Sequence, residues 1–134
     1  MHSTELELDT HGRRVIDVTA RVRAFASDVG GDGLLHLFLP HATAGLALME
    51  TGSGSEGDLE GLLERLLPRD DRYAHRHGSA GHGGDHLLPV VVSSTLTLAV
   101  EGGNLVLGTW QSVVVLDPNR ENDVRRLRLS FLPG

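Results

Sequence analysis

The run at residues 111–117 constrains the fold of this chain more than any other segment. By the strand period of two, Val113 and Val115 lie on one face of this run, while Val114 and Leu116 lie on the other. Both faces are therefore apolar. A strand of this kind is covered by protein on both sides, so we expect a layered structure around it.

The remaining segments alternate short strand patterns with two helical stripes. We expect one helix from Thr19 to Val29, capped by Thr19 and stopped by the glycines after it, and a second from Ser53 or Ser55 to Pro68. Residues 69–85 are polar and glycine-rich and are expected to form a loop. Strands are expected at residues 5–9, 14–18 (a hairpin with the first), 34–39, 45–50, 95–101, 105–115 and 124–131. This order favours an α+β fold, with residues 1–134 as one compact domain, a mostly antiparallel sheet and two main helices.

The composition excludes several function classes. The chain has no cysteine. It also has no lysine, since all 12 of its basic residues are arginine. Thiolate chemistry, Schiff-base catalysis and a phosphate-binding P-loop lysine are therefore ruled out. A net charge of −6 without a basic run argues against nucleic-acid binding. No apolar stretch is long enough to span a membrane and no signal-peptide pattern opens the chain, so we expect a cytoplasmic protein without a membrane partner.

Histidines gather in the segment from Tyr73 to His86, which holds four of the chain's 8. Their spacing matches no standard zinc template, so the segment alone is as typical of a merely solvated loop as of a loosely ordered metal-scavenging one. A longer-range arrangement is more informative. His41, Glu50 and one or two of these histidines could converge across the fold, and such a set serves either a metal ion or acid–base catalysis.

Polar residues at strand ends raise the same choice between a site and a surface. Glu50 ends an apolar row, which fits an exposed strand end as well as a ligand or base at a pocket rim. The Gln111 amide needs a partner, either a backbone group or a substrate. In the last strand Arg126 and Arg128 share one face and Arg125 takes the other. Exposed arginines on an edge strand are ordinary, whereas a guanidinium in a pocket would bind an anion.

Taken in order, these residues resemble the YjbQ family, also called the secondary thiamine-phosphate synthase enzyme family. The resemblance spans essentially the whole chain, and the Gly-Thr-Trp-Gln block together with the upstream histidine and glutamate is its most specific part. Two positions depart from the family pattern: Met49 replaces an asparagine, and Leu87-Leu88-Pro89 replaces a segment with a lysine. The matching residues are His41, Thr43-Ala44, Glu50, Tyr73, His75, His86 before Ser93-Ser94, Gly108 to Gln111, Asp117, and Arg125 to Arg128.

The resemblance implies a compact α+β homotrimer whose histidine site lies in a cleft shared between subunits. It implies His41, His75 and His86 as catalytic residues and metal ligands, with Glu50 as a further catalytic residue. Trp110 and Gln111 would line the substrate pocket, and Arg126 or Arg128 would meet an anion. The metal would be zinc, or magnesium or manganese with a pyrophosphate substrate. The family pattern does not include His77 and His82, which we expect to be solvated.

The family name implies that the chain joins a thiazole phosphate to a pyrimidine pyrophosphate and releases pyrophosphate. That reaction needs cationic groups for the departing pyrophosphate, and the chain offers arginines but no Asp-rich magnesium motif. We therefore expect a His/Glu pocket for a small anionic metabolite, with thiamine-phosphate synthase activity as a secondary transferase activity. The alternatives are a metal-dependent hydrolase-like enzyme and a non-catalytic metal- or metabolite-binding trimer.

Overall fold

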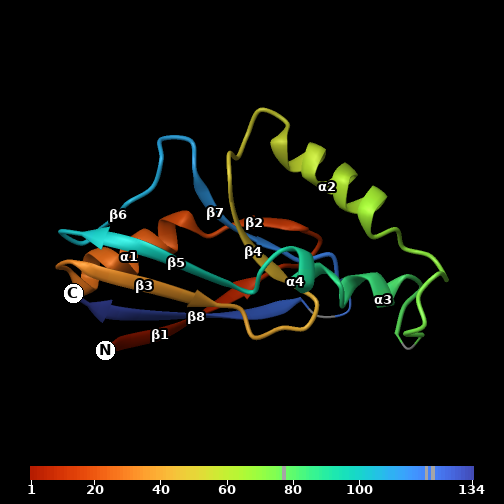
Figure 1. Ribbon diagram of the computed structural model, residues 1–134, viewed down its shortest axis with the longest axis horizontal. Coiled ribbons are helices and arrows are strands. Elements are labelled where there is room, and N and C mark those ends of the chain that lie inside the picture. The colour runs from red at the N-terminus through yellow and green to blue at the C-terminus, as the bar shows by residue number, and fades with distance from the viewer. Residues whose placement is uncertain (77, 120, 122) are drawn as a thin grey trace.

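The computed structural model describes residues 1–76, 78–119, 121 and 123–134. Two antiparallel sheets form the body of the molecule, with helices packed beside them (Figure 1). This arrangement confirms the α+β class expected from the sequence. The elements in chain order are β1 His2–Asp9, β2 Val15–Asp17, α1 Thr19–Val29, β3 Gly33–Phe38, β4 Gly45–Met49, α2 Ser55–Leu66, α3 His82–Asp85, α4 Leu88–Val91, β5 Thr95–Glu101, β6 Asn104–Leu105, β7 Ser112–Leu116 and β8 Val124–Pro133.

The larger sheet has the strand order β1-β8-β3-β5-β6. One face of this sheet is apolar by the period of two, with Leu35 and Leu37 of β3 beside Leu127 and Leu129 of β8. These side chains are buried against α1 and the smaller sheet, and they make up most of the main core. The opposite face carries polar and charged residues, among them Arg126, which pairs in register with Glu7 of β1.

The smaller sheet, β2-β7-β4, has β7 at its centre. Val113 and Val115 face the main core, and Val114 and Leu116 join a second apolar cluster with Leu88. All four of these β7 residues are buried. The expectation of a strand covered on both sides is therefore confirmed.

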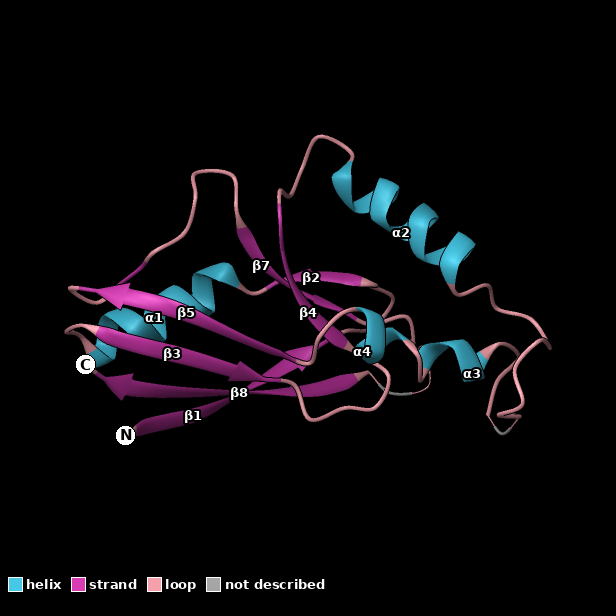
Figure 2. Ribbon diagram, in the orientation of Figure 1, coloured by secondary structure: helices cyan, strands magenta, loops and turns pink. Residues whose placement is uncertain are grey.

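Helix α2 covers the second cluster only partly. Leu59 and Leu63 of α2, and Leu67 just after its end, are half-buried against that cluster, whereas Leu62 and Leu66 are exposed. Figure 2 shows α2 on the outer side of the smaller sheet, at the edge of the body. None of the helices among the described residues is long and apolar enough to cross a lipid bilayer.

Two strand predictions were wrong in their long-range partners. Strand β1 does not form a hairpin with β2. Instead β1 pairs with β8 along its whole length and β2 pairs with β7. This pairing places Leu8 in the main core, with Leu6 packed against it. The strand expected at 105–115 is interrupted as well: residues 106–111 leave the large sheet at β6 and enter the small one at β7.

Two helix predictions also need correction. Thr19 does not cap α1, because Val18 holds the N-cap position and the Thr19 hydroxyl donates a hydrogen bond to Asp17 Oδ1 at 2.6 Å. The expected loop at 69–85 contains the short helix α3, and Pro89 stands in the first turn of α4. Proline is well suited to a first turn, where its missing amide hydrogen leaves no hydrogen bond unmade.

Candidate functional site

Three imidazole rings pack together on the segment that contains α3. The ring centroids of His75 and His86 lie 4.4 Å apart, those of His82 and His86 4.7 Å apart, and those of His75 and His82 5.7 Å apart. The Nε2 atoms of His82 and His86 are separated by 3.0 Å. We call His75, His82 and His86 the histidine cluster. The sequence predicted a site role for His75 and His86, but not for His82.

Glycine residues in α3 allow this cluster to form. A Cβ on Gly83 would lie 2.6 Å from the Cβ of Tyr73 and 2.9 Å from the carbonyl oxygen of His75. A Cβ on Gly84 would lie 2.8 Å from the Tyr73 hydroxyl, which donates a hydrogen bond to the Pro68 carbonyl at 2.7 Å. The bare helix surface lets the chain around Tyr73 lie directly on α3, and this brings His75 against His86.

His82 is buried, in contrast to the solvated position expected for it, because it opens α3, a short helix whose four residues are all buried. His86 is half-buried and His75 is exposed. The cluster therefore runs from the interior to the surface. His77, also expected to be solvated, lies outside the described residues.

Behind the cluster, Asp85 is buried and forms an ion pair with Arg69 through its Oδ1 atom. Its Oδ2 atom lies 3.7 Å from Nδ1 of His82. Burial raises the pKa of Asp85, and the guanidinium of Arg69 opposes that effect. Sequence reasoning missed both residues, since neither belongs to a recognisable motif.

A second polar cluster lies at the end of β7. The Arg125 guanidinium donates to Asp117 through Nε at 2.5 Å and through Nη2 at 3.1 Å, and Nη2 also donates to the Thr43 hydroxyl at 3.1 Å. Asn119 donates to the same hydroxyl at 3.2 Å. Asp117, Thr43 and Arg125 are buried, so these hydrogen bonds compensate for taking two charges out of water.

His41 belongs beside this second cluster. Its Nε2 accepts a hydrogen bond from the backbone amide of Arg126 at 2.9 Å. Burial lowers the pKa of His41, and the nearby positive charge of Arg125 lowers it further. The structure thus ties His41 to β8, with one ring nitrogen already engaged, whereas His75 and His86 face His82.

The other predicted site residues lie elsewhere on the surface. Glu50 follows the end of β4 and is exposed, and Trp110 is 73% exposed. The Gln111 side chain accepts a hydrogen bond from the Gly108 amide at 2.8 Å and so closes its own turn. The turn between β6 and β7 projects from one side of the molecule, well away from α3 (Figure 1).

Alternation along β8 separates the arginines as the period of two requires. Arg125 points inward, whereas the Arg126 and Arg128 side chains are 59% and 50% exposed and each lies 3.9 Å from a carboxylate oxygen of Glu5. The inward arginine is the one that sequence reasoning passed over. Its position on the face shared with Leu127 and Leu129 was the available signal.

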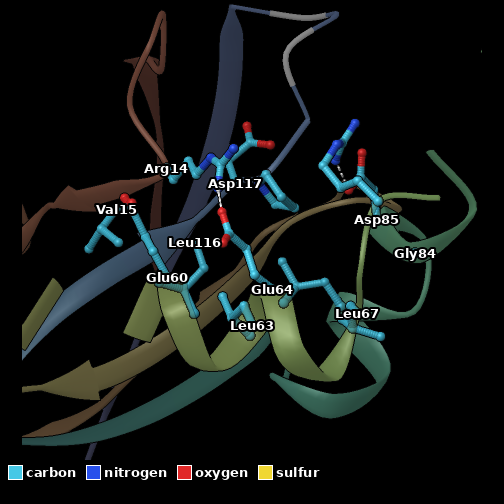
Figure 3. A pocket seen from close by; sticks show the side chains of 13 residues that line it. Arg14, Val15, Glu60, Leu63, Glu64, Leu67, Gly84, Asp85, Leu116 and Asp117 are labelled. Atoms are coloured by element: carbon cyan, nitrogen blue, oxygen red, sulfur yellow. Dashed lines mark hydrogen bonds and ion pairs between the residues drawn. The ribbon is translucent and has the colours of Figure 1, made fainter. Parts of the chain in front are cut away.

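A small, mainly apolar cavity separates α2 from β7 and α3. Leu63 of α2 and Leu67, just after its end, line this cavity with Leu116. Arg14 forms an ion pair with Glu64 at 3.1 Å across the opening (Figure 3). Asp85 and Asp117 both line this cavity. It therefore lies between the two polar clusters. In the part of the chain that the structure describes, no group of three or more His, Asp or Glu residues is arranged to hold a metal ion.

Replacing Arg125 should destabilise the fold severely. Arg125→Leu would leave the Asp117 carboxylate buried without its counter-charge, which costs about 3–5 kcal/mol of unfolding free energy. Arg126→Leu is the matched control on the exposed face and should cost about 0–1 kcal/mol. Urea denaturation measures both values. Equal losses for the two variants would contradict the assignment of Arg125 to the buried pair.

His41 should make the stability depend on pH. Because the folded chain lowers the His41 pKa below the ordinary 6.5, the unfolded chain binds a proton more readily. The free energy of unfolding then falls as the pH drops from the ordinary value through the lowered one. His41→Gln keeps a hydrogen-bond acceptor but does not titrate, so it should lose less stability than the wild type between about pH 7.5 and pH 5. Denaturation at the two pH values gives the comparison, and an equal loss in both proteins would count against it.

The comparisons with known proteins give one consistent family. The family model for UPF0047 protein YjbQ-like matches residues 4–134. A UPF0047 protein of Mycobacterium tuberculosis is 54% identical over 134 residues, covering 100% of both chains. The crystal structure of a hypothetical protein from Aeropyrum pernix superposes with a TM-score of 0.88 at 28% identity, covering 100% of both chains. A YbjQ-like protein of unknown function from Sulfolobus solfataricus reaches 0.91 at 18% identity, covering 99% of this chain and 97% of the other. The chain belongs to the YjbQ-like UPF0047 family.

Proposed function

We propose that the chain binds a small anionic metabolite at the histidine cluster and exchanges protons with it there. The observation that carries this proposal is the 3.0 Å contact between Nε2 of His82 and Nε2 of His86, with His75 packed against the same ring. Imidazole is the side chain best suited to proton transfer near neutral pH. A structural role alone does not explain three imidazole rings in contact, because apolar side chains would pack there at a lower desolvation cost.

The contact between the two rings has a direct chemical consequence. One Nε2 must donate and the other accept, so the pair holds a single proton between them. A second proton would place two N–H groups against each other at 3.0 Å. An anionic oxygen that enters between the rings removes this conflict, because it accepts a hydrogen bond from each. Binding of an anion is thereby coupled to uptake of a proton.

The surface beside the cluster also suits an anion. A hollow lined by Tyr73, His75, Arg76 and His82 opens there. Asp70 and Asp71 also line this hollow, and the Asp70 carboxylate is already paired with Arg72 through two hydrogen bonds of 2.8 Å. Arg76 therefore supplies a cation beside the imidazole donors, as charge-assisted binding of a phosphate-like group requires.

Thiamine-phosphate synthase activity fits this site as a secondary activity. Joining the thiazole phosphate to the pyrimidine releases pyrophosphate, whose oxygens need cationic and N–H donors as they leave. The histidine cluster with Arg76 offers such donors on one small surface. In this proposal the natural substrate is another small anionic metabolite.

A metal-dependent hydrolase is the second candidate, and the same pair of nitrogens favours it. Two imidazole ligands of a tetrahedral zinc ion lie about 3.3 Å apart, given Zn–N bonds of about 2.0–2.1 Å. The 3.0 Å separation of His82 and His86 is close to this value. The described residues do not complete a set of three, so His82 and His86 would bind zinc, magnesium or manganese only together with further ligands.

A homotrimer would bring the remaining predicted residues to the site. Glu50 follows β4, and Trp110 and Gln111 lie in the turn between β6 and β7, which projects from the body well away from α3 (Figure 1). In this proposal they reach the cluster of a neighbouring copy and line the cleft between subunits. The exposed indole of Trp110 supports an interface of this kind, since tryptophan is enriched where proteins meet.

Pyrophosphate binding tests the proposed site. Isothermal titration with inorganic pyrophosphate compares wild type, His86→Gln and His2→Gln, the last being an exposed histidine on β1. Loss of one charge-assisted hydrogen bond weakens binding by about tenfold or more, so His86→Gln should bind at least that much more weakly. His2→Gln should match the wild type.

The same three proteins separate the enzymatic claims. Thiamine phosphate should form in the wild type and in His2→Gln at equal rates, and more slowly in His86→Gln. If pyrophosphate binds equally to all three proteins, the anion site is not at the cluster. If binding falls but synthesis does not, only the synthase activity is refuted. A parallel titration with zinc, unaffected by His86→Gln, would exclude the metal-dependent alternative.

Trp110 fluorescence tests the trimer. The chain has a single tryptophan, which is 73% exposed within one chain. Burial in a subunit interface should shift its emission to shorter wavelength at protein concentrations where sedimentation shows three copies. Trp110→Ala should sediment as smaller species. A monomer with fully solvated emission would rule out the shared cleft.

A further inference from the structure

We infer that Asp85 is a positioning residue: its carboxylate, held by Arg69, lies beside Nδ1 of His82, keeps the proton of the neutral ring on that nitrogen and thereby aims the Nε2 lone pair of His82 at His86. The inference deepens the proposed function, and its meaning for proton exchange rests on that function. Neither Asp85 nor His82 belongs to the site that the family resemblance implies.

The geometry of α3 supports this role. His82 and Asp85 stand three residues apart on one helical turn, a spacing that brings two side chains to the same face. Oδ2 of Asp85 lies 3.7 Å from Nδ1 of His82, and it makes no hydrogen bond with any residue the structure describes. A small rotation of either side chain would close the remaining gap. The other oxygen of the carboxylate is held by Arg69.

Burial strengthens the interaction between His82 and Asp85. The side chains of His82 and Asp85 are only 7% and 4% exposed, so water competes weakly for either group. A buried carboxylate with a free oxygen costs free energy until it finds a donor. Burial raises the pKa of Asp85, and the positive charge of Arg69 opposes that effect. The Nδ1–H tautomer of His82 supplies the missing donor.

The consequence for the cluster is a defined direction of the hydrogen bond between the rings of His82 and His86. With its proton on Nδ1, neutral His82 presents a lone pair at Nε2, and His86 donates its own Nε2–H into it across 3.0 Å. Buried carboxylate–histidine pairs fix the tautomer and orientation of the ring in this way.

Histidine nitrogen NMR tests the inference without any activity assay. Spectra of the full chain labelled with ¹⁵N-histidine distinguish a ring nitrogen that carries hydrogen from one that does not, and His82→Gln identifies the His82 signals by their loss. We expect wild-type His82 as the Nδ1–H tautomer, favoured by roughly tenfold or more, as for a hydrogen bond to a charged group. In Asp85→Asn the amide can donate to Nδ1, so this tautomer should become the minor form. Asp71→Asn, on the exposed part of the same segment, is the matched control and should leave the tautomer unchanged.

Two outcomes would overturn the inference. One is a wild-type His82 that carries its proton on Nε2, which needs no variant to observe. The other is a folded Asp85→Asn protein whose His82 keeps the Nδ1–H tautomer. The tautomer and pyrophosphate binding are read separately. A cluster that fails to bind pyrophosphate but shows the expected tautomer refutes the proposed function and leaves the role of Asp85 standing.

Discussion

Burial of β7 on both faces is the constraint on which the rest of the molecule depends. Val113 and Val115 fill the main core between α1 and the large sheet, while Val114 and Leu116 belong to the second apolar cluster, which packs against α2 and α4. Because the strand is packed on both faces, the position of its C-terminal end is fixed as well. Asp117, the next residue, therefore enters the interior at a fixed place, and Arg125 of β8 must meet it there.

The two polar clusters follow from this geometry. Asp117 and Asp85 line the same cavity, and each carboxylate has its own arginine, Arg125 or Arg69. Pairing of this kind is needed because an isolated buried charge is far too costly. The Asp85–Arg69 ion pair lies directly behind His82, so the charges that stabilise the interior also set the surroundings of the histidine cluster. The structural and the proposed functional roles of these residues are continuous.

Local patterns in the sequence predicted the local structure well. The bounds of β5 matched residue for residue, and the alternation in β8 placed Arg125 opposite Arg126. Partners distant in sequence were harder: nothing in residues 5–18 distinguishes a hairpin from pairing with β8, because both bury the same leucines. His82 was misjudged for a similar reason. Its glycine neighbours suggested a solvated loop, whereas they serve to admit Tyr73 against α3.

The central claim is that His75, His82 and His86 form one ligand-binding cluster. A crystal structure of the wild-type protein grown with inorganic pyrophosphate tests this most directly. The account predicts a pyrophosphate oxygen within hydrogen-bonding distance of Nε2 on both His82 and His86. Pyrophosphate bound instead at the exposed Arg126 and Arg128, with the three imidazole rings apart, would contradict it.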